Sequence, residues 1–208
     1  AWLPEDRVAA EKNGTGGGGG SAAPTPAPPT RRKIDRVRLV SLLVGLAILA
    51  GSGLYLRWDA LREWSYSRQS LAQLKTEAAR PNADPLLRLV YAEKLIAAGR
   101  SPETIPVLGD AVNTLPTNPS GPIPQRIYSR FGHALALGGF TEDAKQFLDL
   151  ARRLDSNDAR IYRGYALIFL SLKNTQNALK QIEIANTLEP ENPEGWYLQG
   201  KAYNELQK

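Results

Sequence analysis

The stretch ARIYRGYALIFLSLKNTQNALKQIEIANTLEP, residues 159–190, decides the fold, because its apolar residues recur at helical spacing in two runs separated by a polar turn. The same pattern returns along the chain at a step of 34 residues. The positions that keep this step are Tyr128, Tyr162 and Trp196; Gly132, Ala166 and Gly200; Ala144 and Ala178; Ala151 and Ala185; and Leu154 and Leu188. Self-similarity at a fixed period is typical of stacked helix pairs.

Within residues 125–158, two apolar stripes are separated by the turn sequence LGGFT. The first stripe surrounds Gly132 and the second surrounds Ala144, so two helices can cross closely at these small residues. Thr141 is a candidate N-cap for the second helix, because acidic residues follow it in the first turn.

This period and pattern resemble the tetratricopeptide repeat family, position by position, at Tyr162, Tyr165, Ala166, Phe169, Ala178, Ile182, Ala185 and Pro190. The resemblance covers units 85–116, 125–158 and 159–192 and a terminal helix at 193–208, with extra residues in the Pro-rich loop TNPSGPIP. The first unit departs from the pattern, since Arg88 replaces an aromatic residue and Thr104 replaces Ala. Ser156 stands where Pro is usual, and Gln199 stands at a normally apolar position. The resemblance implies an all-α fold, a right-handed superhelical stack of helix pairs.

In this family a concave groove is lined by the first helix of each pair. The resemblance carries groove positions over to Arg126, Ser129, Arg130, His133, Arg160, Arg163, Gly164, Leu167, Glu194, Tyr197, Leu198 and Lys201. The predicted partner-binding set is Arg126, Arg130, His133, Arg160, Arg163, Tyr197 and Lys201. Because Arg forks suit carboxylates, we expect an acidic or C-terminal segment as ligand, although charges on exposed helix faces are also ordinary. The first unit offers Leu86, Leu89, Val90 and Glu93, which would suit packing on a partner or on the preceding helix.

A second feature is the uncharged apolar run from Leu39 to Leu56, about 27 Å of helix at 1.5 Å per residue, close to the thickness of a bilayer core. It predicts a transmembrane helix at 34–58, and a cleaved export signal is the alternative interpretation. The flank RRKIDRVR is denser in Lys and Arg than the opposite flank, which predicts a cytoplasmic N-terminus and a periplasmic repeat domain at the bacterial inner membrane. The run contains small residues at Ser41, Gly45, Ala47, Gly51 and Ser52. They would let another membrane helix pack closely, or they reflect only the usual composition of membrane helices.

The flanking segments complete the domain organisation. Residues 1–33 read as a disordered Gly- and Pro-rich tail, whose Trp2 and Leu3 either dock on a neighbouring protein or belong to an ordinary terminus. Residues 59–84 are predicted as a stalk helix and linker, since helical spacing continues without Pro up to Pro81.

Composition argues against catalysis. The chain has no Cys and one His, which removes thiol chemistry and a His-rich metal site. The paired acids Asp143 and Asp149, and Asp155 and Asp158, fall in turns and on solvated faces, and the run GGGGGS lacks the frame of a phosphate loop. Most of the net charge of +5 surrounds the apolar run, so a nucleic-acid footprint is not indicated. We therefore expect a non-enzyme without cofactor, metal, nucleic acid or small-molecule substrate.

Three functional hypotheses remain for a single-pass membrane protein that binds proteins and the lipid bilayer. The first is a structural or stabilising subunit of a larger bacterial membrane complex, for example respiratory or photosynthetic. The second is a membrane-anchored periplasmic chaperone or assembly factor that binds client segments in the groove. The third is a self-assembling scaffold. Fold alone does not choose among them.

Overall fold

The computed structural model describes residues 40, 41, 44 and 58–207. The chain divides into two compact units, 1–47 and 48–208, and residues 58–207 all lie in the second. After helical residues 58–67, the elements are α2 (Leu71–Ala78), α3 (Pro85–Ala97), the short 3-10 turn η1 (Ser101–Glu103), α4 (Thr104–Asn113), α5 (Pro122–Leu137), α6 (Thr141–Leu154), α7 (Ala159–Ser171), α8 (Thr175–Leu188) and α9 (Pro193–Leu206). Over the described residues the chain is all-helical, as predicted.

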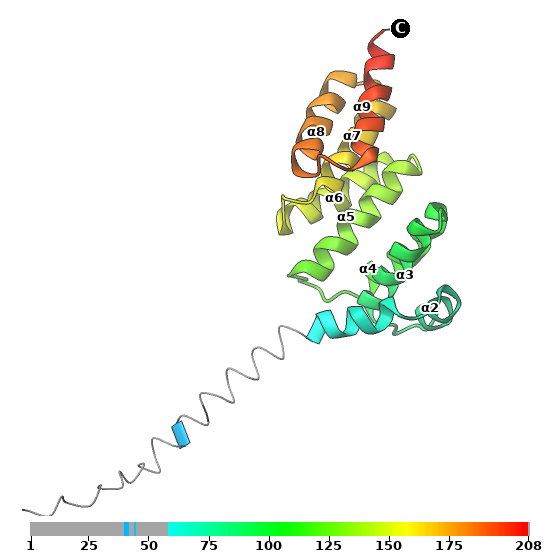
Figure 1. Ribbon diagram of the computed structural model, residues 1–208, viewed down its shortest axis with the longest axis vertical. Coiled ribbons are helices and arrows are strands. Elements are labelled where there is room, and N and C mark those ends of the chain that lie inside the picture. The colour runs from blue at the N-terminus through cyan, green and yellow to red at the C-terminus, as the bar shows by residue number, and fades with distance from the viewer. Residues whose placement is uncertain (1–39, 42–43, 45–57, 208) are drawn as a thin grey trace, which may run out of the picture. The chain divides into compact units, whose positions relative to one another are not determined.

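The helices are arranged in successive pairs (Figure 1). Each of α3, α5 and α7 packs most extensively on the helix that follows it, which gives the pairs α3–α4, α5–α6 and α7–α8. The first helices also pack on one another, α3 on α5, α5 on α7 and α7 on α9. Each pair therefore contacts mainly its neighbours, which is the arrangement of a helical-repeat stack.

Close packing at the centre of the stack depends on Leu148 of α6, whose side chain is fully buried. A Cβ atom placed on Gly132 of α5 would lie 2.8 Å from Leu148 Cγ, and one on Gly164 of α7 would lie 2.7 Å from Leu148 Cδ1. Leu148 therefore fills a slot between two first helices, and the slot exists because both of them carry Gly at this point.

Two predicted helix starts differ from the structure. At α6 the N-cap is Phe140 rather than Thr141, because Gly139 at φ +82° turns the chain and the amide of Ala144 already donates to the carbonyl of Phe140. At α5 the helix includes residues 122–124 of the expected loop TNPSGPIP. A Pro residue at the first helical position is favourable because its missing N–H has no partner there anyway.

Residues 59–84 form two helical segments instead of the predicted single stalk helix. The break follows residue 67, and Ser70 caps α2 through a reciprocal capping box with Gln73. Such a box satisfies backbone donors at a new helix start, so the chain begins again there. In α2 the side chains of Leu74 and Ala78 are buried in the same core as those of α3, so α2 packs on the stack.

The predicted membrane segment falls largely outside the described residues. So do Gly45, Ala47, Gly51 and Ser52 of the small-residue set and Trp2 and Leu3 of the tail, while Ser41 is described as helical. Among residues 40, 41, 44 and 58–207, no helix combines the length and the apolar character needed to cross a membrane.

Candidate protein-binding face

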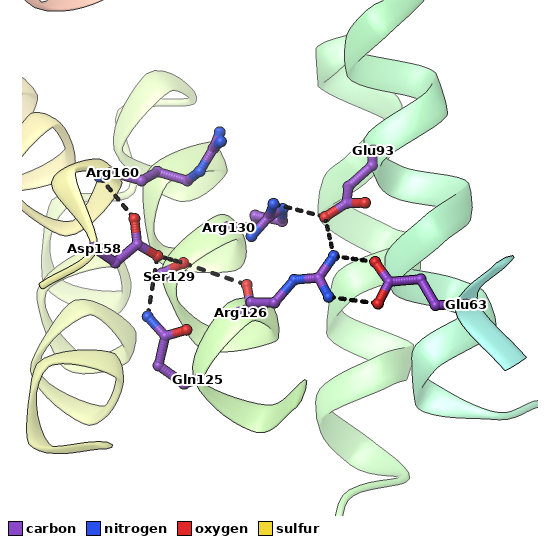
Figure 2. Close-up of polar contacts among 8 residues, drawn as sticks. All are labelled: Glu63, Glu93, Gln125, Arg126, Ser129, Arg130, Asp158 and Arg160. Carbon is purple, nitrogen blue, oxygen red and sulfur yellow. Dashed lines mark hydrogen bonds and ion pairs between the residues drawn. The ribbon is translucent and has the colours of Figure 1, made fainter. Parts of the chain in front are cut away.

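Arg126 of α5 connects three segments of the chain (Figure 2). Its guanidinium donates two hydrogen bonds to Glu63, at 2.9 and 2.7 Å, and one to Glu93 of α3 at 3.0 Å. Glu93 also pairs with Arg130 at 2.6 Å. The hydrogen bond from Arg126 lowers the pKa of Glu63, and the same contact raises the pKa of Arg126. Two Arg residues of the predicted groove are therefore bound by carboxylates of the chain itself.

Arg130 and Arg160 are neighbouring cations, and the carboxylates nearest to them are Glu93, Asp158 and Glu194. Burial is the main reason that the pKa of Arg130 falls to about 10, and the positive charge of Arg160 lowers it further. The Nε atom of Arg130 is buried and has no hydrogen-bond partner among the described residues. The guanidinium of Arg160 forms no ion pair with any described residue, and in Figure 2 only its backbone is joined to Asp158. An added anion would stabilise both cations.

Asp158 holds α5 and α7 together beneath this pair of cations. Its carboxylate caps α7 through the backbone amide of Arg160 at 2.9 Å. It also accepts from the Ser129 hydroxyl at 2.6 Å and from Gln125 at 3.0 Å, both on α5. Burial would raise the pKa of Asp158, but these donors lower it. The capping carboxylate is thus ionised and fixes the position of Arg160.

A second polar cluster joins α5, α7 and α9 at Glu194. Its Oε1 lies 2.9 Å from His133 Nε2, and its Oε2 lies 3.0 Å from Arg163 Nε, although neither contact has hydrogen-bond geometry. Arg163, only 1% exposed, also donates to Glu189 at 2.8 Å. Burial would raise the pKa of Glu194, but His133, Arg163 and Arg160 together lower it to about 2. His133 and Arg163 therefore hold the stack together in this structure.

The remaining groove positions divide between the surface and the core. Tyr197 is 70% exposed and Lys201 is also exposed, and Lys201 forms no ion pair with the described residues. Three other positions, Ser129, Gly164 and Leu198, are buried in the stack. Of the predicted partner-binding set, Arg160, Tyr197 and Lys201 are thus the side chains without a carboxylate partner in residues 58–207. The binding role of the whole set stays a prediction.

The apolar positions of the first unit also lie inside the fold. Leu86, Leu89 and Val90 are buried with Leu74 of α2 in one core. This agrees with the expectation that they pack on the preceding segment. Glu93 is different, since it faces α5 and binds Arg126 and Arg130.

Arg88 explains why the first unit departs from the repeat pattern. It is 3% exposed and donates to the carbonyls of Ala78, Arg80, Pro81 and Asp110 and to the hydroxyl of Thr114. These acceptors lie at and beyond the C-terminal ends of α2 and α4, where carbonyl groups lack helical partners and a cation is favoured. The aromatic residue expected at this position would leave those acceptors without this donor.

The carboxylates that bind the groove cations are what the sequence-based reasoning missed. Glu63 precedes the repeats, and Glu194 was predicted as a groove position without its partners. The only sequence signal was the position of Glu93 and Glu194 on the same repeat face as the Arg residues. Within the part of the chain that the structure describes, no group of three His, Asp or Glu residues is placed to hold a metal ion.

Comparison with known proteins gives structural likeness only. No protein-family model matches the chain, and no curated protein matches it. Among solved structures, the chain is similar to the first tetratricopeptide domain of human RPAP3, with 20% identity, a TM-score of 0.47, and coverage of 59% of this chain and 92% of that one. It is also similar to the first such domain of Spaghetti (RPAP3) bound to the HSP90 peptide SRMEEVD, with 19% identity, a TM-score of 0.47, and coverage of 61% and 96%.

A third similar structure is YrrB, described as a tetratricopeptide protein with an unusual peptide-binding site. It has 16% identity and a TM-score of 0.44, and the match covers 56% of this chain and 57% of that chain. The chain thus spans little more than half the length of YrrB. All three TM-scores lie below 0.5, which is too low to carry the ligand of any of these proteins over to this chain.

Proposed function

We propose that this protein is a membrane-anchored, non-catalytic scaffold whose repeat stack binds an acidic segment of a protein partner. The observation that carries the proposal is the pair Arg130 and Arg160. Arg130 pairs with Glu93 but has a buried Nε without a hydrogen-bond partner among the described residues, and Arg160 forms no ion pair with any of them. A carboxylate of a ligand would pair with Arg160 and offset the positive charge of Arg130, since charge-assisted hydrogen bonds to Arg are among the strongest that proteins form.

The membrane part of the proposal rests on the sequence. The uncharged run Leu39–Leu56 is long enough to span a bilayer core, and its N-terminal flank is rich in Arg. In this proposal the repeats are periplasmic and the protein is a stabilising subunit of a larger bacterial membrane complex. The small-residue positions of the run, Gly45, Ala47, Gly51 and Ser52, together with Ser41, would then contact other membrane helices of that complex.

The first experiment is purification of the tagged full chain from native membranes in mild detergent, with the mass and composition of what accompanies it. One complex at fixed stoichiometry would support the subunit role. Many partners at low and varied amounts would support a periplasmic chaperone or assembly factor instead. A homo-oligomer without other proteins would indicate a self-assembling scaffold.

The ligand site is tested by Arg160→Ala in the same purification. The control is Arg153→Ala on α6, because Arg153, like Arg160, forms no ion pair with the described residues; Arg153 is exposed, whereas Arg160 is half-buried. We expect the partner to be lost with Arg160→Ala and kept with Arg153→Ala. If both variants keep the partner at full stoichiometry, the anion site at Arg160 is wrong, although the membrane scaffold itself is not affected.

A further inference from the structure

Helical residues 58–67 carry an apolar face that the described part of the chain leaves about half exposed. Trp58, Leu61 and Trp64 are 55%, 51% and 55% exposed. They follow one another at steps of three residues, so they lie along one side of the helix. Two exposed Trp residues and a Leu residue on so short a helix are unusual for a surface in contact with water only.

The opposite face of the same helix is fixed to the repeat stack. Arg62 pairs with Asp84 at 2.6 Å, and the Tyr66 hydroxyl donates to the same carboxylate at 3.0 Å. Glu63 accepts the two hydrogen bonds from Arg126. With these three contacts in place, the helix cannot roll to bury its Trp residues, so its apolar face points away from the stack.

A cation lies over one ring of this face. The guanidinium of Arg68 is 4.0 Å from the centre of the Trp64 ring. The side chains of Trp and Arg each have an apolar body and a polar or charged tip. Such side chains are favoured at the headgroup layer of a bilayer. An apolar strip with a cation at its edge is the composition of helices that lie in that layer.

The sequence indicates which surface is near. The uncharged run Leu39–Leu56 ends two residues before Trp58, so the chain leaves the proposed membrane span where this helix begins. We propose that the face formed by Trp58, Leu61 and Trp64 lies in the headgroup layer of the bilayer, with Arg68 near the lipid phosphates. The helix, spanning roughly 15 Å, then sets the orientation of the repeat stack relative to the membrane. This inference rests on the proposed membrane anchor.

The test uses the full chain in vesicles of phosphatidylcholine and phosphatidylglycerol that carry a fluorescence quencher attached near the headgroup. One variant keeps Trp64 and replaces the other three Trp residues with Phe. The control keeps only Trp196, which is matched in exposure at 53% but lies on α9. We expect the emission of Trp64 to be blue-shifted and quenched by the labelled lipid, and the emission of Trp196 to be unaffected.

A second measurement avoids the multiple replacement, because Trp196 donates a hydrogen bond to the carbonyl of Pro190 that Phe cannot make. The single variants Trp64→Phe and Trp196→Phe are compared with the unchanged chain. The lipid-quenched fraction of the total emission should fall with Trp64→Phe and rise with Trp196→Phe. Equal fractions in the three proteins would overturn the inference.

The anchor is tested independently by flotation of the vesicles after an alkaline carbonate wash. If the chain floats and Trp64 is not quenched, the interfacial helix is wrong while the anchor stands. If the chain does not float, the anchor fails and the inference fails with it. If Trp64 is shielded from iodide in native membranes but unquenched in the vesicles, a protein partner covers the face and the inference is also overturned.

Discussion

Replacing Gly132 with Ala tests the packing at the centre of the stack. The new Cβ would lie 2.8 Å from Leu148 Cγ, 2.9 Å from Leu148 Cδ2 and 3.0 Å from the backbone N of Leu148. A change of rotamer could move the side-chain atoms of Leu148 but not its backbone N, so α6 must move away from α5. Overpacking of this kind costs about 1–3 kcal/mol, while Ala in place of Gly within a helix gains about 1 kcal/mol. We expect a net loss of about 0–2 kcal/mol in the free energy of unfolding.

The chain contains a matched control at the same position of the repeat. Gly200 in α9 has nothing within 4 Å of a placed Cβ, so Gly200→Ala adds helix propensity without a clash. We expect it to stabilise the protein by about 0.5–1 kcal/mol. Urea unfolding of the full chain in mild detergent, followed by circular dichroism in the far ultraviolet, measures both.

If Gly132→Ala stabilises the protein as much as Gly200→Ala does, the close approach of Leu148 does not limit packing between α5 and α6. A double variant adds a second check. Leu148→Ala removes two of the three close contacts, so Gly132→Ala should cost less in that background than in the unchanged chain. Additive effects of the two substitutions would show that Leu148 is not the obstacle.

Three further predictions concern single residues. Arg88→Leu should lower the free energy of unfolding by about 3 kcal/mol, because buried carbonyls at the ends of α2 and α4 lose their donor; a loss below about 1 kcal/mol in urea unfolding would contradict this. The ionised Glu194 stabilises the fold above its unfolded pKa of 4.5, and this stability is lost as the pH falls toward its folded pKa of about 2. The difference in unfolding free energy between the unchanged chain and Glu194→Gln should therefore shrink by about 2 kcal/mol from about pH 6 to pH 3, and a constant difference would argue against a lowered pKa. Lys173 has a φ of +57°, so Lys173→Gly should raise the melting temperature and stabilise by about 0.5–1 kcal/mol, since its ion pair with Glu205 is 3.3 Å long and exposed; a lower melting temperature would disprove the backbone strain.

The repeat pattern was predictable from sequence because it depends on local spacing. The residues at Gly132, Ala144 and Leu148 mark where two helices meet, and the structure places α5 and α6 in contact there. Helix ends were less predictable, since Phe140 and Pro122 depend on the backbone turn that precedes each helix.

The electrostatic character of the candidate site could not be read from one repeat at a time. Arg126 is a free cation when α5 is considered alone. Its partners come from residue 63 before the repeats and residue 93 in the first unit, so the pairing depends on how units stack. In the same way Arg88 looks misplaced until the ends of α2 and α4 are brought to it.

The contact between Glu63 and Arg126 has a consequence for the order of assembly. In a stack where each unit contacts its neighbours, folding can begin at any repeat and spread along the chain. This ion pair closes a loop between residues 63 positions apart, and closing so long a loop before α3 and α5 are in place carries an entropic cost. The contact between helical residues 58–67 and α5 should therefore form last during folding and break first under load, before the repeats themselves separate.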